Sequence, residues 1–240
     1  MNLYLTRAYL NKTAPVSAIN SLLNPEDPNR KLDAHHKLIW TLFPGKDKPR
    51  DFLWRSEKSN CFYILSNRIP KNTGLFDSIG FSTKEFTPNL NVGDKLKFIL
   101  RANATKDKPQ SLGEGVSKKS QRVDLVMDKL IRIPGQNSLV DGEKSERANK
   151  RFEIASEVAK DWIHKKGKNS GFSPVSESIL CNDYSVRQFA RGKLNKVTFG
   201  ILDISGIITI SDPKLFLESL GKGFGRAKAY GCGLMLVRRA

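Results

Sequence analysis

The order in which strand-like and helix-like segments follow one another is the feature that most limits the fold of this chain. Residues 3–10 (LYLTRAYL) alternate between apolar and polar side chains, which predicts a strand with one buried face. The apolar runs 50–58 and 61–69 are separated by Ser59-Asn60 alone, which predicts a hairpin. The first part of the chain therefore supplies three strands.

A helix and two further segments complete this unit. Residues 34–43 have helical spacing, Asp33 can cap the helix, and residues 44–45 (Pro-Gly) end it. Residues 74–80 predict a short helix or a turn, and residues 83–88 a strand. The resulting order is β-α-β-β-α-β, which is the ferredoxin-like pattern.

The second half of the chain repeats this order with longer connections, although no repeat is visible in the residues themselves. We therefore expect an α+β protein with two tandem ferredoxin-like (RRM-like) domains, residues 1–92 and 96–240. The second unit consists of the predicted strands 95–106, 122–127, 175–191, 196–210 and 233–239 and the predicted helices 147–166 and 213–220.

The charge of the chain limits its partners. Lys and Arg total 41 against 24 Asp and Glu, a formal net charge of +17. The excess positive charges repel one another in a monomer. This repulsion favours binding to a polyanion, either nucleic acid or an anionic membrane. No apolar run approaches the roughly 18 residues of a spanning helix, and the N-terminus lacks a signal-peptide pattern. Nucleic acid is therefore the expected partner, with no membrane.

The cysteines give no sign of a metal site. Cys61, Cys181 and Cys232 are far apart, and the chain has no C-x-x-C and no His-x-x-x-His pair. This pattern indicates reduced thiols in a cytoplasmic protein, with no zinc and no other cofactor.

Two adjacent histidines, His35 and His36, lie at different places relative to the apolar stripe of the predicted helix. At 100° per residue, the apolar residues in 38–43 form one stripe; His35 falls within it and His36 falls at its edge, one turn from Trp40. A packing role therefore suits His35, and a functional role suits His36. His164 lies near the end of a predicted helix, where its charge favours the helix dipole without any further role.

Histidine and lysine chemistry fits the cleavage of RNA. The ribose 2′-hydroxyl can attack the adjacent phosphate if a base accepts its proton or an acid protonates the leaving 5′-oxygen. Histidine can serve either role near neutral pH, and Lys and Arg can stabilise the charge on the phosphorus. This reaction needs no metal.

The glycine-rich tail, residues 221–239, has five basic residues and no acidic one. Its glycines can bring backbone N–H groups close to phosphates, and basic side chains add charge. The alternative is a turn-rich connection between the last helix and the last strand. The residues expected to meet RNA are Gly223, Gly225, Arg226 and Lys228.

Two further basic runs lie in the second half. Residues 186–196 include Arg187, Arg191 and Lys193, and the loop 106–122 ends in Lys118, Lys119 and Arg122. Any one such run is usually a solvated face. Three runs together with the net charge predict a nucleic-acid surface.

Several motifs occur in the order that characterises one known family. These are HHKLIWTLFPG, RDFLWR, LRAN-x-x-K at residues 100–106, and G-x-G-x-A-K-A-x-G-x-G-L at residues 223–234. The chain resembles the CasE family of CRISPR-associated endoribonucleases from type I-E systems. The matching motifs span nearly the whole sequence.

The resemblance implies metal-independent cleavage of precursor CRISPR RNA at the 3′ base of the repeat stem-loop. It implies a 2′,3′-cyclic phosphate or 3′-phosphate end and retention of the product among the other Cascade subunits. The family's catalytic histidine, four residues before the Trp-x-Leu-Phe-Pro run, is His36 here. We add Lys37, and from the matching motifs Arg101 and Lys106, to the expected RNA contacts.

One position departs from the family pattern. Family members often have a tyrosine three residues before the histidine, where this chain has Asp33. Tyr4, Tyr9, Lys37 or a water could then be the second proton-transfer group. A non-catalytic subunit that binds an RNA hairpin on the same fold is the alternative. A general ribosomal-type RNA binder is a third possibility, but it gives no reason for the ordered motifs.

Overall fold

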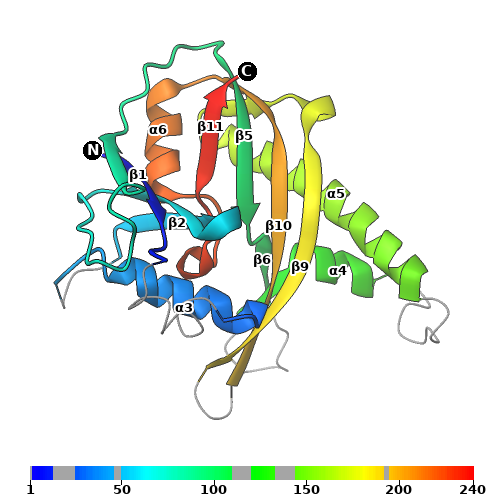
Figure 1. Cartoon of the computed structure of the whole chain (residues 1–240). Coiled ribbons are helices and arrows are strands. Elements are labelled where there is room, and N and C mark those ends of the chain that lie inside the picture. Colours follow the sequence, from blue (N-terminus) through cyan, green and yellow to red (C-terminus); the bar gives the residue numbers. More distant parts are fainter. Residues whose placement is uncertain (1, 13–24, 46–49, 110–119, 133–143, 192–194) are drawn as a thin grey trace, which may run out of the picture.

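The first half of the chain forms a four-stranded antiparallel sheet. The computed structural model describes residues 2–12, 25–45, 50–109, 120–132, 144–191 and 195–240 (Figure 1). The sheet order is β2-β3-β1-β4, which is the ferredoxin-like order that the sequence predicts. Its elements are β1 (Tyr4–Tyr9), α3 (Pro28–Trp40), β2 (Phe52–Glu57), η1 (Lys58–Asn60), β3 (Cys61–Ser66) and β4 (Ser82–Glu85).

The second half forms a five-stranded sheet in the equivalent order. β11, β5 and β10 are neighbours, and both β8 and β9 pair with β10. A separate hairpin, β6-β7, leaves the end of β5. The elements are β5 (Lys95–Ala102), β6 (Thr105–Pro109), β7 (Ser120–Asp124), α4 (Leu125–Ile131), α5 (Lys144–Lys168), β8 (Phe172–Pro174), η3 (Ser176–Ser178), β9 (Leu180–Arg191), β10 (Asn195–Ile210), α6 (Pro213–Lys222), η4 (Lys228–Tyr230) and β11 (Met235–Arg239).

Two local predictions were wrong because a helix is capped elsewhere. α3 begins at Pro28, and the Asp27 side chain accepts a hydrogen bond from the Asn29 N–H at 2.8 Å, so Asp33 lies inside the helix rather than at its start. The predicted strand 122–127 ends at Asp124, whose carboxylate accepts from two N–H groups of α4 and starts that helix. Of the two alternatives for residues 74–80, the structure has the turn, since residues 67–81 contain no helix.

The cap at the last helix is confirmed. Asp212 accepts a hydrogen bond from the Leu215 N–H at 2.9 Å, and Pro213 occupies the first turn, where its missing N–H costs nothing. The long helix predicted for residues 147–166 is also present as α5.

Apolar packing also joins the two sheets. Trp54 of β2 is fully buried in one cluster with Ile201 of β10 and Cys232. A smaller cluster joins Leu53 to Leu234. The division into residues 1–92 and 96–240 stays a prediction, because the apolar packing runs across it.

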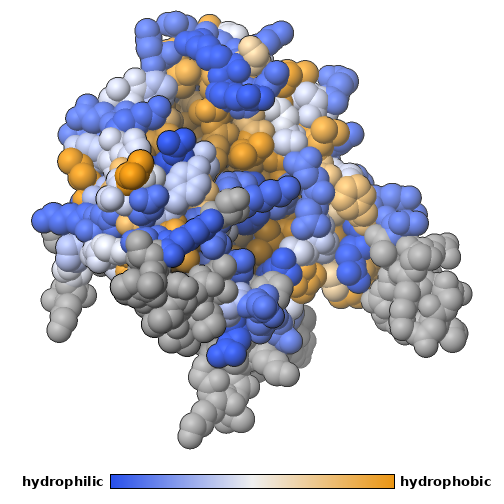
Figure 2. Space-filling view, viewed as in Figure 1, coloured by the Kyte–Doolittle hydropathy of each residue, from blue (hydrophilic) through white to orange (hydrophobic). Residues whose placement is uncertain are grey.

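The open face of the second sheet carries apolar side chains. α5 and α6 lie behind this sheet, and Figure 2 shows apolar surface gathered over β5 and its neighbours in front. Ile99 and Leu180 are 38% and 59% exposed, and both line a groove across this face. Within the described residues, no helix is long and apolar enough to cross a membrane.

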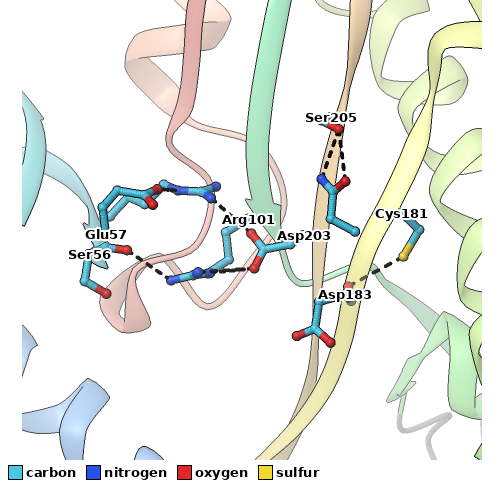
Figure 3. Close-up of polar contacts among 9 residues, drawn as sticks. Ser56, Glu57, Arg101, Cys181, Asp183, Asp203 and Ser205 are labelled. Carbon is cyan, nitrogen blue, oxygen red and sulfur yellow. Dashed lines mark hydrogen bonds and ion pairs between the residues drawn. The ribbon is translucent and has the colours of Figure 1, made fainter. Parts of the chain in front are cut away.

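One carboxylate joins the two halves. Asp203 of β10 lies 3.2 Å from Arg55 of β2 and 3.1 Å from Arg101 of β5. Arg101 also donates to the Ser56 carbonyl at 3.5 Å, as Figure 3 shows. The side chains of Arg55, Arg101 and Asp203 are 8%, 21% and 20% exposed, respectively. Solvent therefore screens these ion pairs only weakly.

We predict that Asp203→Asn destabilises the protein by about 3 kcal/mol, because the largely buried Arg101 guanidinium loses its carboxylate and Arg55 keeps only its pair with Glu57. Urea unfolding followed by circular dichroism measures the change. Asp183→Asn is the matched control, since Asp183 lies opposite Asp203 in the β9-β10 pairing and is exposed. The control should change the free energy of unfolding by less than about 0.5 kcal/mol. Equal effects of both variants would contradict the role of Asp203 in joining the two halves.

Candidate active site

The two adjacent histidines of α3 have different surroundings, as the helical projection predicts. His35 is 2% exposed, and its ring meets the Phe62 ring edge-on at 4.8 Å between centroids. Burial, with a smaller effect from Lys31, lowers the pKa of His35 to about 4. His36 is only partly buried, at the surface of the same helix. His35 is therefore a neutral core residue, and His36 remains the candidate for chemistry.

His36 has two aromatic neighbours. The Trp40 indole Nε1–H donates a hydrogen bond to His36 Nε2 at 3.1 Å. The Tyr230 ring, from η4 in the glycine-rich tail, lies 6.4 Å from the His36 ring between centroids. The histidine is thus enclosed by one residue from its own helix and by one from the far end of the chain.

Cations surround this position. Burial lowers the pKa of His36, and Arg50 and Lys37 lower it further, whereas Asp33 raises it. Burial also lowers the pKa of Lys228, with contributions from Arg50 and Lys166. Arg50 therefore acts electrostatically on both His36 and Lys228. A titratable imidazole among fixed positive charges can move a proton beside a phosphate and stabilise the charge that develops there.

The glycines of the tail allow it to pack closely against the protein. Gly223 and Gly225 have φ angles of 74° and 76°, which other residues rarely adopt. A Cβ on Gly225 would come within 2.9 Å of the Asn103 carbonyl and 3.2 Å of the Trp162 ring. These glycines are therefore needed for packing, whether or not the loop binds phosphate, and their phosphate contacts stay a prediction.

Several predicted RNA contacts form ion pairs within the protein. Lys37 pairs with Asp33 at 2.7 Å, and Lys106 with Asp128 at 2.5 Å. Arg101 pairs with Asp203, as described above. Asp107 takes two partners, Arg122 at 3.3 Å and Arg226 at 3.6 Å. Their RNA contacts stay predictions.

Asp128 anchors the base of the β6-β7 hairpin. It is 7% exposed, and besides Lys106 it pairs with Lys108 and with Arg132, the latter at 3.1 Å. These cations hold the pKa of its carboxyl below the usual range against the opposing effect of burial. Lys118 and Lys119, between the two strands of this hairpin, lie outside the described residues.

The β9-β10 hairpin reaches the helix that carries His36. The Gln188 N–H of β9 donates to the Asn29 side-chain oxygen of α3 at 3.0 Å. Figure 1 shows the ends of β9 and β10 passing α3 and projecting beyond it. Arg187 lies on β9 next to this contact, and Arg191 ends the strand. Lys193 lies outside the described residues.

Sequence reasoning missed three residues of this site. The sequence places Trp40 one turn from His36, and an i, i+4 pair on a helix is the signal for contact. Arg50 falls at the start of a predicted strand, and the tail motif gives Tyr230 no role. No local pattern places Arg50 or Tyr230 beside His36, because their contacts are tertiary.

The described residues contain no group of three or more His, Cys, Asp or Glu side chains placed to hold a metal ion. His164 lies near the end of α5, and its Nε2 is 3.1 Å from the Ser176 hydroxyl.

Comparison with known proteins gives consistent matches over nearly the full chain. Residues 3–239 match the family model described as CRISPR associated protein. The CRISPR system Cascade subunit CasE of Escherichia coli (strain K12) is 29% identical over 220 residues, which cover 86% of this chain and 92% of that protein.

Solved structures share the fold. A Thermus thermophilus Cse3 bound to an RNA representing a pre-cleavage complex has a TM-score of 0.63 at 18% identity, covering 99% of this chain and 100% of that one. The CRISPR-associated protein Cas6e from Escherichia coli K-12 has a TM-score of 0.54 at 21% identity, with the same coverage. At these identities the likeness concerns the fold.

We predict that protonation of His35 makes the protein less stable in mild acid. Because the folded pKa of about 4 lies below the ordinary 6.5, the unfolded chain binds a proton that the folded chain does not. This contribution is complete above pH 6.5 and is lost as the pH falls to 4, by about 3 kcal/mol in total. Urea unfolding at a series of pH values measures it. His35→Leu should flatten that dependence; the same slope in the variant would assign the proton to another group.

Proposed function

The chain belongs to the CasE family of CRISPR-associated proteins, and from this premise we propose that it is a metal-independent endoribonuclease. It cuts precursor CRISPR RNA at the base of the repeat stem-loop. The observation that carries this proposal is the half-buried His36, which lies beside cationic groups on the helix that meets the basic β9-β10 hairpin.

The substrate itself supplies the nucleophile in this reaction. The 2′-hydroxyl loses its proton, its oxygen forms a bond to the adjacent phosphorus, and the bond from phosphorus to the 5′-oxygen breaks. The 5′-oxygen takes up a proton, which gives a 5′-hydroxyl and a 2′,3′-cyclic phosphate or, after hydrolysis, a 3′-phosphate. His36 moves one of the two protons, and Arg50 and Lys228 stabilise the charge on the phosphorane.

A second group must move the other proton. Lys37 is held in an ion pair with Asp33, and Tyr9 shares a hydrogen bond with Cys61 that raises the pKa of its phenol. Tyr230 contacts the His36 ring. Tyr230 therefore joins Tyr4, Tyr9, Lys37 and water as a candidate for this role.

We propose that the product stays bound to the protein within a Cascade complex. The relatives support this, since one is a Cascade subunit and Cse3 has been solved with a 19-nucleotide RNA. The basic residues of the β9-β10 hairpin, with Arg187 at the contact with α3, would hold the RNA stem close to His36.

Replacement of His36 by Ala is expected to abolish cleavage and to leave affinity for the repeat hairpin nearly unchanged. Loss of histidine acid-base catalysis costs about 10²–10⁴ in rate, whereas binding comes mostly from contacts with phosphates. Single-turnover cleavage and filter binding of a radiolabelled repeat RNA give the two readouts. His164→Ala is the control and should cut at the parent rate. If His36→Ala also cuts at that rate, another residue does the chemistry.

A single 2′-deoxy substitution just upstream of the cut should stop the reaction, because it removes the nucleophile. Binding should survive, since the stem still presents its phosphates, and EDTA should have no effect on cleavage of the unmodified RNA. The same gel assay measures all three. Cleavage of the deoxy substrate, or loss of activity in EDTA, would point to a hydrolytic, metal-dependent mechanism. Binding without any cleavage of RNA would favour the non-catalytic subunit.

A further inference from the structure

The hydrogen bond between Trp40 and His36 determines where the imidazole proton resides. The indole Nε1–H can only donate, and it donates to His36 Nε2 at 3.1 Å. The accepting nitrogen must therefore carry a lone pair. The neutral imidazole has one N–H, which this contact assigns to Nδ1.

Packing holds the indole in this position. The Trp40 ring meets the Phe52 ring edge-on at 5.0 Å between centroids, and Phe52 stacks on Phe43 at 4.6 Å with an angle of 8° between the planes. Phe52 and Phe43 are each 3% exposed. The donor is thus aimed by a rigid aromatic cluster and not by a mobile surface side chain.

The nearby cations act in the same direction, and one carboxylate opposes them. On α3, Lys37 disfavours the imidazolium and Asp33 favours it, but these two side chains pair with each other at 2.7 Å. Arg50 disfavours it from the segment that precedes β2.

Two other elements pack on α3. Tyr230 faces the ring from η4, where Lys228 lies on the same turn. β9 packs near the start of the helix, where Arg187 adds positive charge. The charged residues that these two elements bring to α3, Lys228 and Arg187, are both cationic.

We propose that Trp40 is a positioning residue that keeps His36 neutral, with its proton on Nδ1 and its lone pair on Nε2, so that His36 acts as the base. This proposal rests on the proposed ribonuclease function. The indole N–H occupies the place of the substrate's 2′-hydroxyl. When RNA binds, the hydroxyl replaces the indole and gives its proton to Nε2 as the new bond between O2′ and phosphorus forms. The departing 5′-oxygen takes its proton from a second donor, either a neighbouring side chain or water.

The free protein tests the contact without RNA. In ¹⁵N-histidine-labelled protein, long-range ¹H–¹⁵N spectra distinguish a protonated from an unprotonated ring nitrogen, and His36→Ala identifies the His36 signals among the three histidines. We expect protonated Nδ1 and unprotonated Nε2 in the parent protein near neutral pH. A protonated Nε2 would overturn the proposal. This measurement needs no variant of Trp40, so it does not depend on whether such a variant folds.

Trp40→Phe tests the energetic effect, because it keeps an aromatic ring against Phe52 and removes only the donor. Loss of a hydrogen bond to the neutral form should raise the pKa of His36 by up to about one unit. Thr41→Val is the matched control, since it removes a hydroxyl that donates to the Leu38 carbonyl at the same helix end. The control should leave the pKa of His36 unchanged. An unchanged pKa in Trp40→Phe would overturn the proposal.

The pH profile of single-turnover cleavage, taken at protein concentrations well below saturation, tests the role of His36 as base, because under these conditions the profile reports the pKa of the free protein. The rate should rise with pH through that pKa, and the profile of Trp40→Phe should move to higher pH by the shift measured in the spectra. Below the pKa the variant should cut up to about tenfold more slowly; above it the variant should cut at least as fast, because no indole competes for Nε2. A rate that falls as the pH rises through this pKa would make His36 the acid and overturn the base role. Absence of cleavage in both proteins would refute the ribonuclease function and the base role with it, while the spectra still decide the Trp40 contact.

Discussion

The carboxylate of Asp203 is the interaction on which the arrangement of the two sheets depends. It lies on β10 and pairs with Arg101 from the neighbouring strand and with Arg55 from the other sheet. Removing such charges from water is costly unless each finds a partner, so the pairing accepts only one placement of β2 against β5 and β10. The apolar contacts of Trp54 and Leu53 with the second half follow from that placement.

The glycine-rich tail closes over the same junction and completes the site. A Cβ on Gly231 would lie 3.2 Å from the Trp54 ring, and one on Gly223 would lie 2.7 Å from Leu53. Only a tail without side chains at these points can approach β2 so closely. That approach brings η4 onto α3 and puts Tyr230 beside His36. The candidate active site is therefore built by both halves of the chain, and neither half contains it alone.

The ion pairs among the predicted RNA contacts are compatible with a binding surface. Arg122, Arg226 and their common partner Asp107 are each about half exposed. Pairs of this kind contribute little to stability, so the cations can exchange a carboxylate for a phosphate at small cost. Asp128 differs, because it is buried under three cations and fixes the hairpin base. With a net charge of +17, the chain keeps a large positive excess after its internal pairs are satisfied.

The sequence by itself predicted the order of the main strands, the cap and proline of α6, and the different burial of His35 and His36. These features depend on neighbours within one or two turns or on the period of a single helix, so local spacing is enough to predict them. The predicted start of α3 at Asp33 is wrong, because residues 28–32 are mostly polar and add little to the apolar pattern, whereas the Asp27 side chain caps the helix. Only the tertiary structure decided that Arg50 and Tyr230 lie near His36 and that Lys228 lies near Arg50. Their positions follow from the pairing of Asp203 with two strands and from the close approach of the tail, and such long-range contacts leave no periodic signal in the chain.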